Sequence, residues 1–156
     1  MRLNRGWIES HIPHSGRMCL LDEVLEWETD RIRCASNSHR AADHPLRAHG
    51  RLGIACGIEI AAQAMAVHGA LSADESSSRP RAGLLAGVRG VRMYAARLDD
   101  AQADLICEAA RVAGDEGTAL YDFELSSAGS ILMRGRATVV LDAAGARMRV
   151  DASVPQ

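Results

Sequence analysis

The longest apolar stretch of the chain predicts a buried helix at the centre of the fold. From Gly53 to Leu71 the only side chains with polar heads are Glu59, Gln63 and His68. A helix that is apolar on all sides is typical of a protein core, and at about 1.5 Å per residue this one would span about 28 Å. A glutamate in the middle of the stretch argues against a membrane span. We therefore expect a central helix over about residues 53–71.

After this helix the pattern changes to the two-residue alternation of β-strands. In the clearest case Tyr121, Phe123 and Leu125 alternate with the acidic residues Asp122 and Glu124. Four strands are predicted here, at Ala82–Ala96, Ala103–Val112, Thr118–Ser126 and Ser130–Asp142. Residues 114–117 and 128–129 have the composition of hairpin turns. These strands favour an antiparallel sheet.

Before the helix the signals are shorter. Arg31–Ser38 alternates apolar and charged positions and predicts a strand, whereas Met18–Trp27 fits either a strand or a helical turn. Residues 1–17 are expected to be an irregular lead-in and His39–Arg51 a loop that feeds the helix. Strands, one helix and more strands indicate an α+β fold, in which one sheet wraps one helix. The exposed edge of such a sheet favours a dimer.

The length of 156 residues predicts a single domain over residues 1–142. Ser72–Pro80 is predicted to be a polar linker, and residues 143–156 a polar C-terminal tail. The formal net charge of −2 gives no electrostatic case for nucleic acid. The four cysteines are scattered without a paired motif, which argues against a metal site. The N-terminus has no apolar signal core, so we expect a cytoplasmic protein.

The carboxylate on the predicted helix is the main indication of function. Glu59 and Gln63 are four residues apart and so share one helix face. A carboxylate in apolar surroundings must be paired, protonated or engaged in chemistry, and burial raises its pKa. Glu59 is therefore either a catalytic acid or a structural carboxylate that binds strand amides or an arginine.

Three blocks of the sequence resemble the hotdog-fold 3-hydroxyacyl-[acyl-carrier-protein] dehydratases. Residues 12–24, IPHSGRMCLLDEV, resemble the family opening LPHRYPFLLVDRV, and residues 59–63, EIAAQ, resemble the EAMAQ of its central helix. The strands from 82 to 142 match the family in number and order. The segment GIEIAAQAMAVHG follows a PLR…GRL loop. In this respect the chain looks like the divergent dehydratase-like proteins of aryl-polyene and polyketide gene clusters. This resemblance implies a hotdog fold, an antiparallel sheet wrapped around one long helix.

The sequence departs from the family at the catalytic histidine, which the family carries in a GHFPG motif before the helix. If residues 43–47, DHPLR, align with the family's NEPFF, His49 takes the catalytic position. If residues 50–53, GRLG, align with the subgroup's GHLPG, Arg51 takes it instead. His44 is a further candidate in the same loop. The histidine is thus ambiguous, whereas the family glutamate corresponds directly to Glu59.

The resemblance implies dehydration of 3-hydroxyacyl thioesters carried on acyl carrier protein, in fatty-acid-like or polyketide (aryl-polyene type) synthesis. Glu59 would be the acid and His49 the base, meeting if the loop folds back or across a dimer interface. Substrate-binding candidates are Arg51, Gln63 as an orienting amide, and the free N–H groups around Gly53 and Gly57, which would polarise the thioester carbonyl. No metal or dissociable cofactor is implied, because a phosphopantetheine arm delivers the substrate.

Several alternatives remain at this stage. The chain could be a non-catalytic hotdog subunit that pairs with an active dehydratase, or an acyl-thioester hydrolase, and its dimer could be homodimeric or heterodimeric. His14 matches a family histidine that is structural, and His68 lies near the helix end. A set of arginines near the first long strand would suit an acidic carrier protein or form a solvated face; its members are Arg79, Arg81, Arg89, Arg92 and Arg97.

Overall fold

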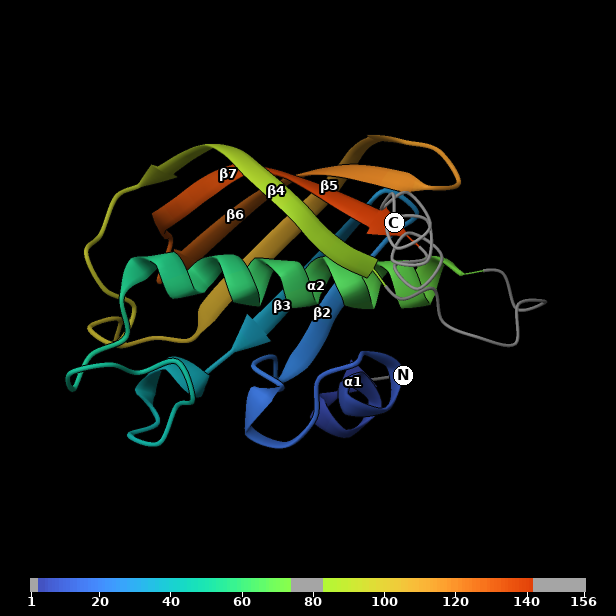
Figure 1. Cartoon of the computed structure of the whole chain (residues 1–156). Helices are drawn as coiled ribbons and strands as arrows, with labels where there is room; N and C mark the ends of the chain where they lie inside the picture. The colour runs from blue at the N-terminus through green and yellow to red at the C-terminus, as the bar shows by residue number, and fades with distance from the viewer. Residues whose placement is uncertain (1–2, 74–82, 142–156) are drawn as a thin grey trace, which may run out of the picture.

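Helix α2, Gly57–Ser72, lies across one face of a seven-stranded sheet that curves around it (Figure 1). The structure, a computed structural model, describes residues 3–73 and 83–141. Its elements are, in chain order, β1 Leu3–Asn4, α1 Arg5–His11, β2 Glu23–Trp27, β3 Arg31–Ser36, α2, β4 Gly83–Met93, β5 Leu105–Gly114, β6 Thr118–Ser127 and β7 Ser130–Leu141. The predicted central helix, the strand at 31–38 and the four later strands are confirmed within a few residues.

The strands follow the spatial order β1-β2-β3-β5-β6-β7-β4, and every neighbouring pair is antiparallel. Strand β4 directly follows α2 in the chain, yet it lies at the far edge of the sheet beside β7. Strand β1 lies at the other edge. This is the predicted hotdog arrangement, an antiparallel sheet wrapped around one long helix.

The first seventeen residues contain regular structure, so the prediction of an irregular lead-in is wrong. Leu3 pairs with Val24 of β2, and the Asn4 side chain caps α1 by accepting a hydrogen bond of 3.1 Å from the Trp7 N–H. Asparagine is a favoured N-cap, but the helix is only two turns long and its stability depends on burying Ile8. The segment Met18–Trp27, which fitted either a strand or a helical turn, contains strand β2. A short helical turn ends at its first residue, Met18. The predicted tail 143–156 and most of the predicted linker lie outside the described residues.

Helix α2 is the core of the protein because the strands of the curved sheet pack against it. Gly57 lies so close to the sheet that an added Cβ would be 2.8 Å from Leu125 of β6 and 3.4 Å from Met133 of β7. The region Ile54–Ser72 is long and apolar enough to cross a membrane by length and composition. Half of that window is nevertheless buried inside the structure, which is the position expected of a core helix.

Near the end of α2, His68 lies in a fully buried polar site. Its Nδ1 is 2.7 Å from the hydroxyl of Tyr121, and its Nε2 is 3.0 Å from the carbonyl oxygen of Glu28. A neutral imidazole fits both partners if Nε2–H donates to the carbonyl and Nδ1 accepts from the hydroxyl. His68 therefore ties the helix end to the sheet and has a structural role.

We expect the free energy of unfolding to fall as the pH is lowered from about 7.5 to about 5.5. Exposed carboxylates titrate below this pH range. Burial lowers the pKa of His39, His44 and His68. The unfolded chain, with histidine pKa values near about 6.5, then binds more protons than the folded chain as the pH falls. Denaturant unfolding at both pH values measures this loss of free energy of unfolding. The loss should be smaller in the His68→Gln variant. Equal stability at the two pH values would contradict this prediction.

Candidate functional site

Glu59 and His14 form a charged or hydrogen-bonded pair on the open side of α2. The His14 Nε2 is 3.1 Å from Oε1 of Glu59. Glu59 lies in the first turn of α2, and His14 lies in the connection between α1 and β2. The two side chains come from parts of the sequence 45 residues apart, so the fold rather than a local motif brings them together.

Gln63 fixes the geometry of this pair from one helical turn further along. Its side-chain amide donates to the Met18 carbonyl oxygen over 2.7 Å and to Oε1 of Glu59 over 3.2 Å. Its carbonyl oxygen accepts from the Leu20 N–H over 2.8 Å. Gln63 is completely buried. It therefore holds the Glu59 carboxyl group and the segment that follows His14 in one fixed arrangement, as the orienting role predicted for it requires.

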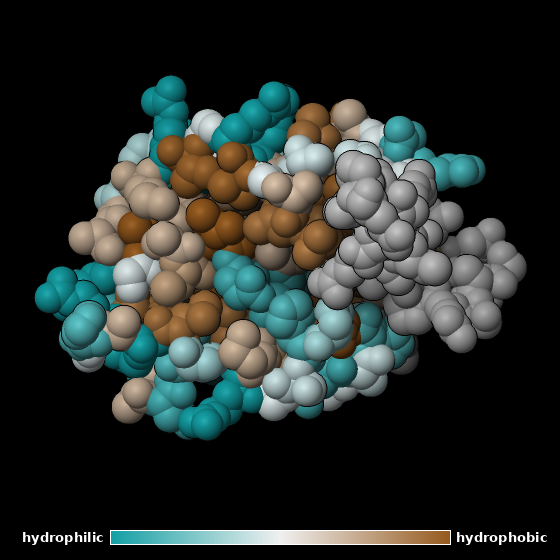
Figure 2. Space-filling model, viewed as in Figure 1, coloured by the Kyte–Doolittle hydropathy of each residue, from teal (hydrophilic) through white to brown (hydrophobic). Residues whose placement is uncertain are grey.

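The pair opens onto a small, mostly apolar pocket of about 170 Å³ between α2 and β4. The side chains of Glu59 and His14 are 33% and 30% exposed, so both are accessible to a ligand. The other lining residues are apolar: Pro13, Ala62, Ala66, Gly83, Leu84, Leu85 and Val139. Figure 2 shows apolar side chains gathered on this face of the molecule, over β4 and β7 beside α2. Such a site can accept a short acyl group beside two ionisable side chains.

The sequence predicts that the Glu59 carboxyl group is paired, protonated or engaged in chemistry, and the structure shows it paired, with partners that the sequence did not identify. Its Oε1 contacts both His14 and Gln63, and a third of the side chain is exposed. The helical pattern could not show this, because the segment carrying His14 covers the helix at this point. The contact between Oε1 and the imidazole lets one proton reside on either group. The pair can therefore accept a proton at one point of a reaction and donate it at another.

His49, the base predicted from the family alignment, lies at the tip of a tight turn. The turn is closed by two hydrogen bonds between Ala48 and Arg51, of 3.0 and 3.1 Å. His49 and Gly50 have φ values of 54° and 76°, the left-handed conformation that such a two-residue turn needs. His49 is exposed and does not line the pocket that contains Glu59. Within one chain the structure does not bring the two residues together, and the role of His49 stays a prediction.

Arg51 closes the same turn and is also exposed. Two anchors hold this loop against the rest of the protein. Asp99 accepts a hydrogen bond from the Leu52 N–H over 3.1 Å, and Arg47 reaches Oδ2 of Asp99 over 3.5 Å. The hydrogen bonds from the Arg97 guanidinium hold the pKa of the Asp99 carboxyl well below its usual range. The loop is thus tethered at its base, while its tip is open to solvent or a partner.

The segment before α2 was predicted to offer free N–H groups to a thioester carbonyl. A 3-10 turn, Ile54–Cys56, occupies this position. The Ile54 N–H donates to the Ala96 carbonyl oxygen, and the Cys56 N–H donates to that of Gly53, each over 3.1 Å. Gly57 faces β6 and β7 rather than the pocket. The N–H groups of Ile54 and Cys56 are therefore already used within the protein, and the carbonyl-binding role of Gly53 and Gly57 stays a prediction.

The other candidate side chains are distributed over the molecule. His44 is buried, and its Nδ1 accepts from the Leu46 N–H over 3.1 Å, away from Glu59. Arg97 binds Asp99, Arg89 and Arg92 lie on β4, and Arg79 and Arg81 lie outside the described residues. The four cysteines are free. Across residues 3–73 and 83–141, no group of three or more histidine, cysteine, aspartate or glutamate side chains could hold a metal ion.

His14 is the site residue that sequence reasoning assigned to a purely structural role. The signal was present, because His14 belongs to the block resembling LPHRYPFLLVDRV. What the sequence lacked was the path of the chain after α1, which places this block against the first turn of α2. The buried Nδ1 of His14 has no hydrogen-bond partner in the described part of the chain, so Glu59 is the group that orients the imidazole.

Comparison with known proteins identifies the family and agrees with the fold. A family model described as ApeP-like, ApeP dehydratase, matches residues 7–148. No curated protein matches the chain. A chain of the dehydratase heterocomplex ApeI:P from Xenorhabdus doucetiae is 24% identical with a TM-score of 0.75, over 86% of this chain and 90% of that one.

Two thioesterases are more distant structural matches. A variant thioesterase of Pseudomonas aeruginosa is 14% identical with a TM-score of 0.56, over 76% of this chain and 79% of that one. A thioesterase of Haemophilus influenzae is 12% identical with the same TM-score, over 76% of each chain. At these identities all three structural matches establish the hotdog fold and no more than the fold.

Proposed function

Because this chain belongs to the ApeP-like dehydratase family, we propose that it dehydrates 3-hydroxyacyl thioesters, with Glu59 and His14 as the acid and base. The observation that carries the proposal is the 3.1 Å contact between these side chains at the mouth of an apolar pocket. Dehydration needs a group that removes a proton and a group that supplies one, both within reach of adjacent carbon atoms. The pair provides both.

The reaction removes water across the C2–C3 bond of the acyl chain. His14 takes a proton from C2, and the electron pair of the broken C–H bond forms the C2–C3 double bond. The C3–O bond breaks as Glu59 gives its proton to the departing hydroxyl group, which leaves as water. Histidine suits the first role because its ordinary pKa is close to neutral pH. Proton transfer from His14 to Glu59 restores the starting state of the pair.

The apolar pocket walls support an acyl substrate, and the carrier-protein thioester is the form that we propose for its delivery. The phosphopantetheine arm of an acyl carrier protein would bring the thioester to the pocket between α2 and β4, within the fatty-acid-like or aryl-polyene type of synthesis. The ApeI:P structure is a heterocomplex. By analogy we propose that this chain also pairs with a second, non-identical hotdog chain.

The direct test is incubation of the purified chain with a 3-hydroxyacyl carrier protein, followed by mass spectrometry of the intact carrier protein. We expect a product lighter by one water, with the acyl group still attached. Free thiol is measured in parallel, since hydrolysis would release it and dehydration does not. Thiol release without loss of water would replace the proposal with a hydrolase. No reaction by the chain alone would favour a non-catalytic hotdog subunit.

A further inference from the structure

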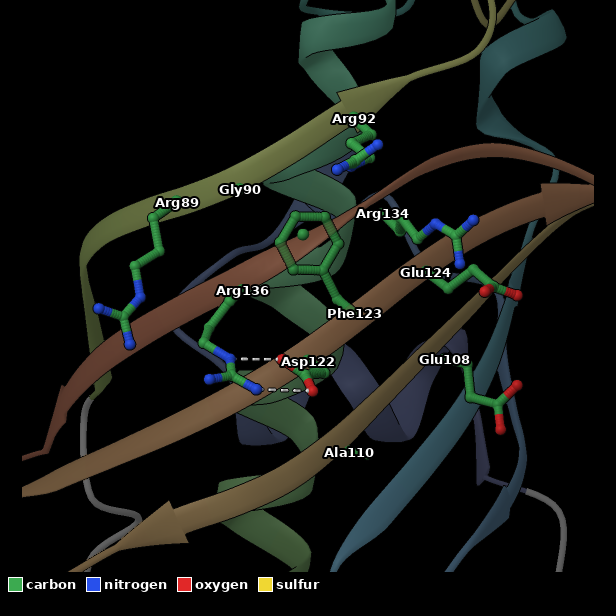
Figure 3. A pocket seen from close by; sticks show the side chains of 11 residues that line it. Arg89, Gly90, Arg92, Glu108, Ala110, Asp122, Phe123, Glu124, Arg134 and Arg136 are labelled. Carbon is green, nitrogen blue, oxygen red and sulfur yellow. Dashed lines mark hydrogen bonds and ion pairs between the residues drawn. The ribbon is translucent and has the colours of Figure 1, made fainter.

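The face of the sheet that points away from α2 carries two rows of charged side chains, which run across neighbouring strands (Figure 3). In one row Asp122 of β6 is paired with Arg136 of β7, which is paired with Arg89 of β4. In the other, Glu108, Glu124, Arg134 and Arg92 follow one another from β5 to β4. The rows line an open hollow of about 900 Å³. Negative charge lies at the centre of the sheet and positive charge at the β4 edge.

A β-bulge in β4 places both of its arginines on this outer face. Arg89 pairs with Arg136 and Arg92 with Arg134, so three steps along β4 match two steps along β7. An odd number of steps in a regular strand would turn the second side chain to the opposite face. The extra residue is accommodated at Gly90, whose φ of 61° suits glycine. The bulge therefore keeps Arg89 and Arg92 side by side on the outside of the sheet.

Two of the three carboxylates of these rows, those of Asp122 and Glu108, are bound by arginines other than Arg89 and Arg92. Arg136 binds Asp122 through two hydrogen bonds, of 2.7 and 3.1 Å. Glu108 is 3.8 Å from Arg31 on the far side of the row. For Arg89 and Arg92 the described part of the chain provides neither an ion pair nor a side-chain hydrogen bond, and both are exposed. The β4 edge thus presents two cations that have no partner among the described residues.

The same strand exposes apolar side chains on the opposite face. Val88 and Met93 are 37% and 46% exposed, although their register with Ala137 and Met133 of β7 places them on the side of the sheet that faces α2. Among the described strands β4 has β7 as its only neighbour, so the backbone groups of its outer side are available for pairing. An exposed edge with an apolar face is a template for strand addition. An incoming strand would bury Val88 and Met93 on one face and contact Arg89 and Arg92 on the other.

We propose that the β4 edge selects a non-identical partner by charge. Arg89 and Arg92 repel the same arginines of a second copy of this chain, and they attract an edge strand whose carboxylates lie on the outer face. Two copies joined along β4 would place four arginines without partners on one face of adjacent strands, which lie about 4.8 Å apart. Like charges at that spacing are destabilising across strands. A partner strand with apolar residues inward and carboxylates outward satisfies both faces. The proposal rests on the hotdog partnership proposed above and names the feature that selects the partner.

A charge-reversed copy of this chain serves as a defined probe. The variant Arg89→Glu/Arg92→Glu is mixed with the unmodified protein, one of them carrying a fluorophore at its N-terminus, and sedimentation velocity measures mixed and self association. We expect mixed pairs to form about tenfold more tightly than either self pair at low ionic strength. The preference should shrink at about 0.5 M salt, where screening shortens the range of the interaction.

A matched control changes the same amount of charge elsewhere. The variant Arg17→Glu/Arg33→Glu alters exposed arginines away from β4 and should show no preference for mixed pairs. The proposal is overturned if unmodified copies associate as tightly as mixed ones, or if the control shows the same preference. Association is measured without substrate, so its outcome is independent of whether the chain is a dehydratase.

Discussion

Replacing Glu59 with glutamine is expected to lower the rate of dehydration by about 10²-fold or more, because the amide cannot supply a proton to the departing hydroxyl group. Glutamine keeps the size of the side chain and can still contact His14 and Gln63, so the fold should be preserved. The measurement is the initial rate of enoyl-thioester formation on the carrier protein. Glu9→Gln is the matched control, since the Glu9 side chain is 34% exposed, almost as much as that of Glu59. It should leave the rate unchanged.

Parallel histidine variants identify the base. His14→Gln should lower the rate to a similar extent, whereas His49→Ala should have little effect, because His49 lies at the tip of an exposed turn away from the pocket. The opposite result, with activity lost only in His49→Ala, would assign the base to the residue that the family alignment favours. It would also require that the loop of a partner chain reach Glu59.

Replacing Gln63 with leucine is expected to lower the free energy of unfolding by about 2 to 4 kcal/mol. The change leaves the buried Leu20 N–H without its acceptor and the Met18 carbonyl oxygen without its donor. Each buried polar group without a partner costs about 1 to 3 kcal/mol. Denaturant unfolding followed by circular dichroism measures the loss, and dehydration should weaken as well because the His14 segment is no longer fixed.

Gln102→Leu provides the comparison for this result. Gln102 is exposed and its amide donates only to a nearby carbonyl oxygen, that of Asp100, so its loss should change stability by less than about 0.5 kcal/mol. A Gln63→Leu protein as stable as the unmodified one would show that the Met18–Leu20 segment is held by its apolar packing. The orienting role of Gln63 would then be abandoned.

The elements that sequence could predict are those whose pattern is set by burial along a single element. Helix α2 and strands β4 to β7 are long, and their apolar positions repeat with the period of the structure that they form. Helix α1 was missed because a helix of two turns has little pattern of its own. Its Asn4 cap and the single buried side chain of Ile8 stabilise it only once Leu3 pairs with β2.

The candidate site was only partly predictable for a related reason. Glu59 and Gln63 share one face of one helix, so their spacing alone placed them together. His14 comes from a segment 45 residues earlier, and the alignment with known dehydratases directed attention to His49 instead. Only the path of the chain from α1 to β2 brings His14 to 3.1 Å from Glu59, and no periodicity within either segment encodes that contact.

The sequence by itself determined that this protein has an antiparallel sheet and one long apolar helix that carries Glu59, because hydrophobic burial acts through patterns local to each element. Tertiary structure alone decided which histidine meets Glu59 and which arginines have no partner within residues 3–73 and 83–141. The contact with Glu59 depends on the path of the chain from α1 to β2, and the exposure of the two arginines depends on the order of the strands and on a bulge at Gly90 in β4. Such pairings are set by how distant segments pack, and a linear pattern does not contain them.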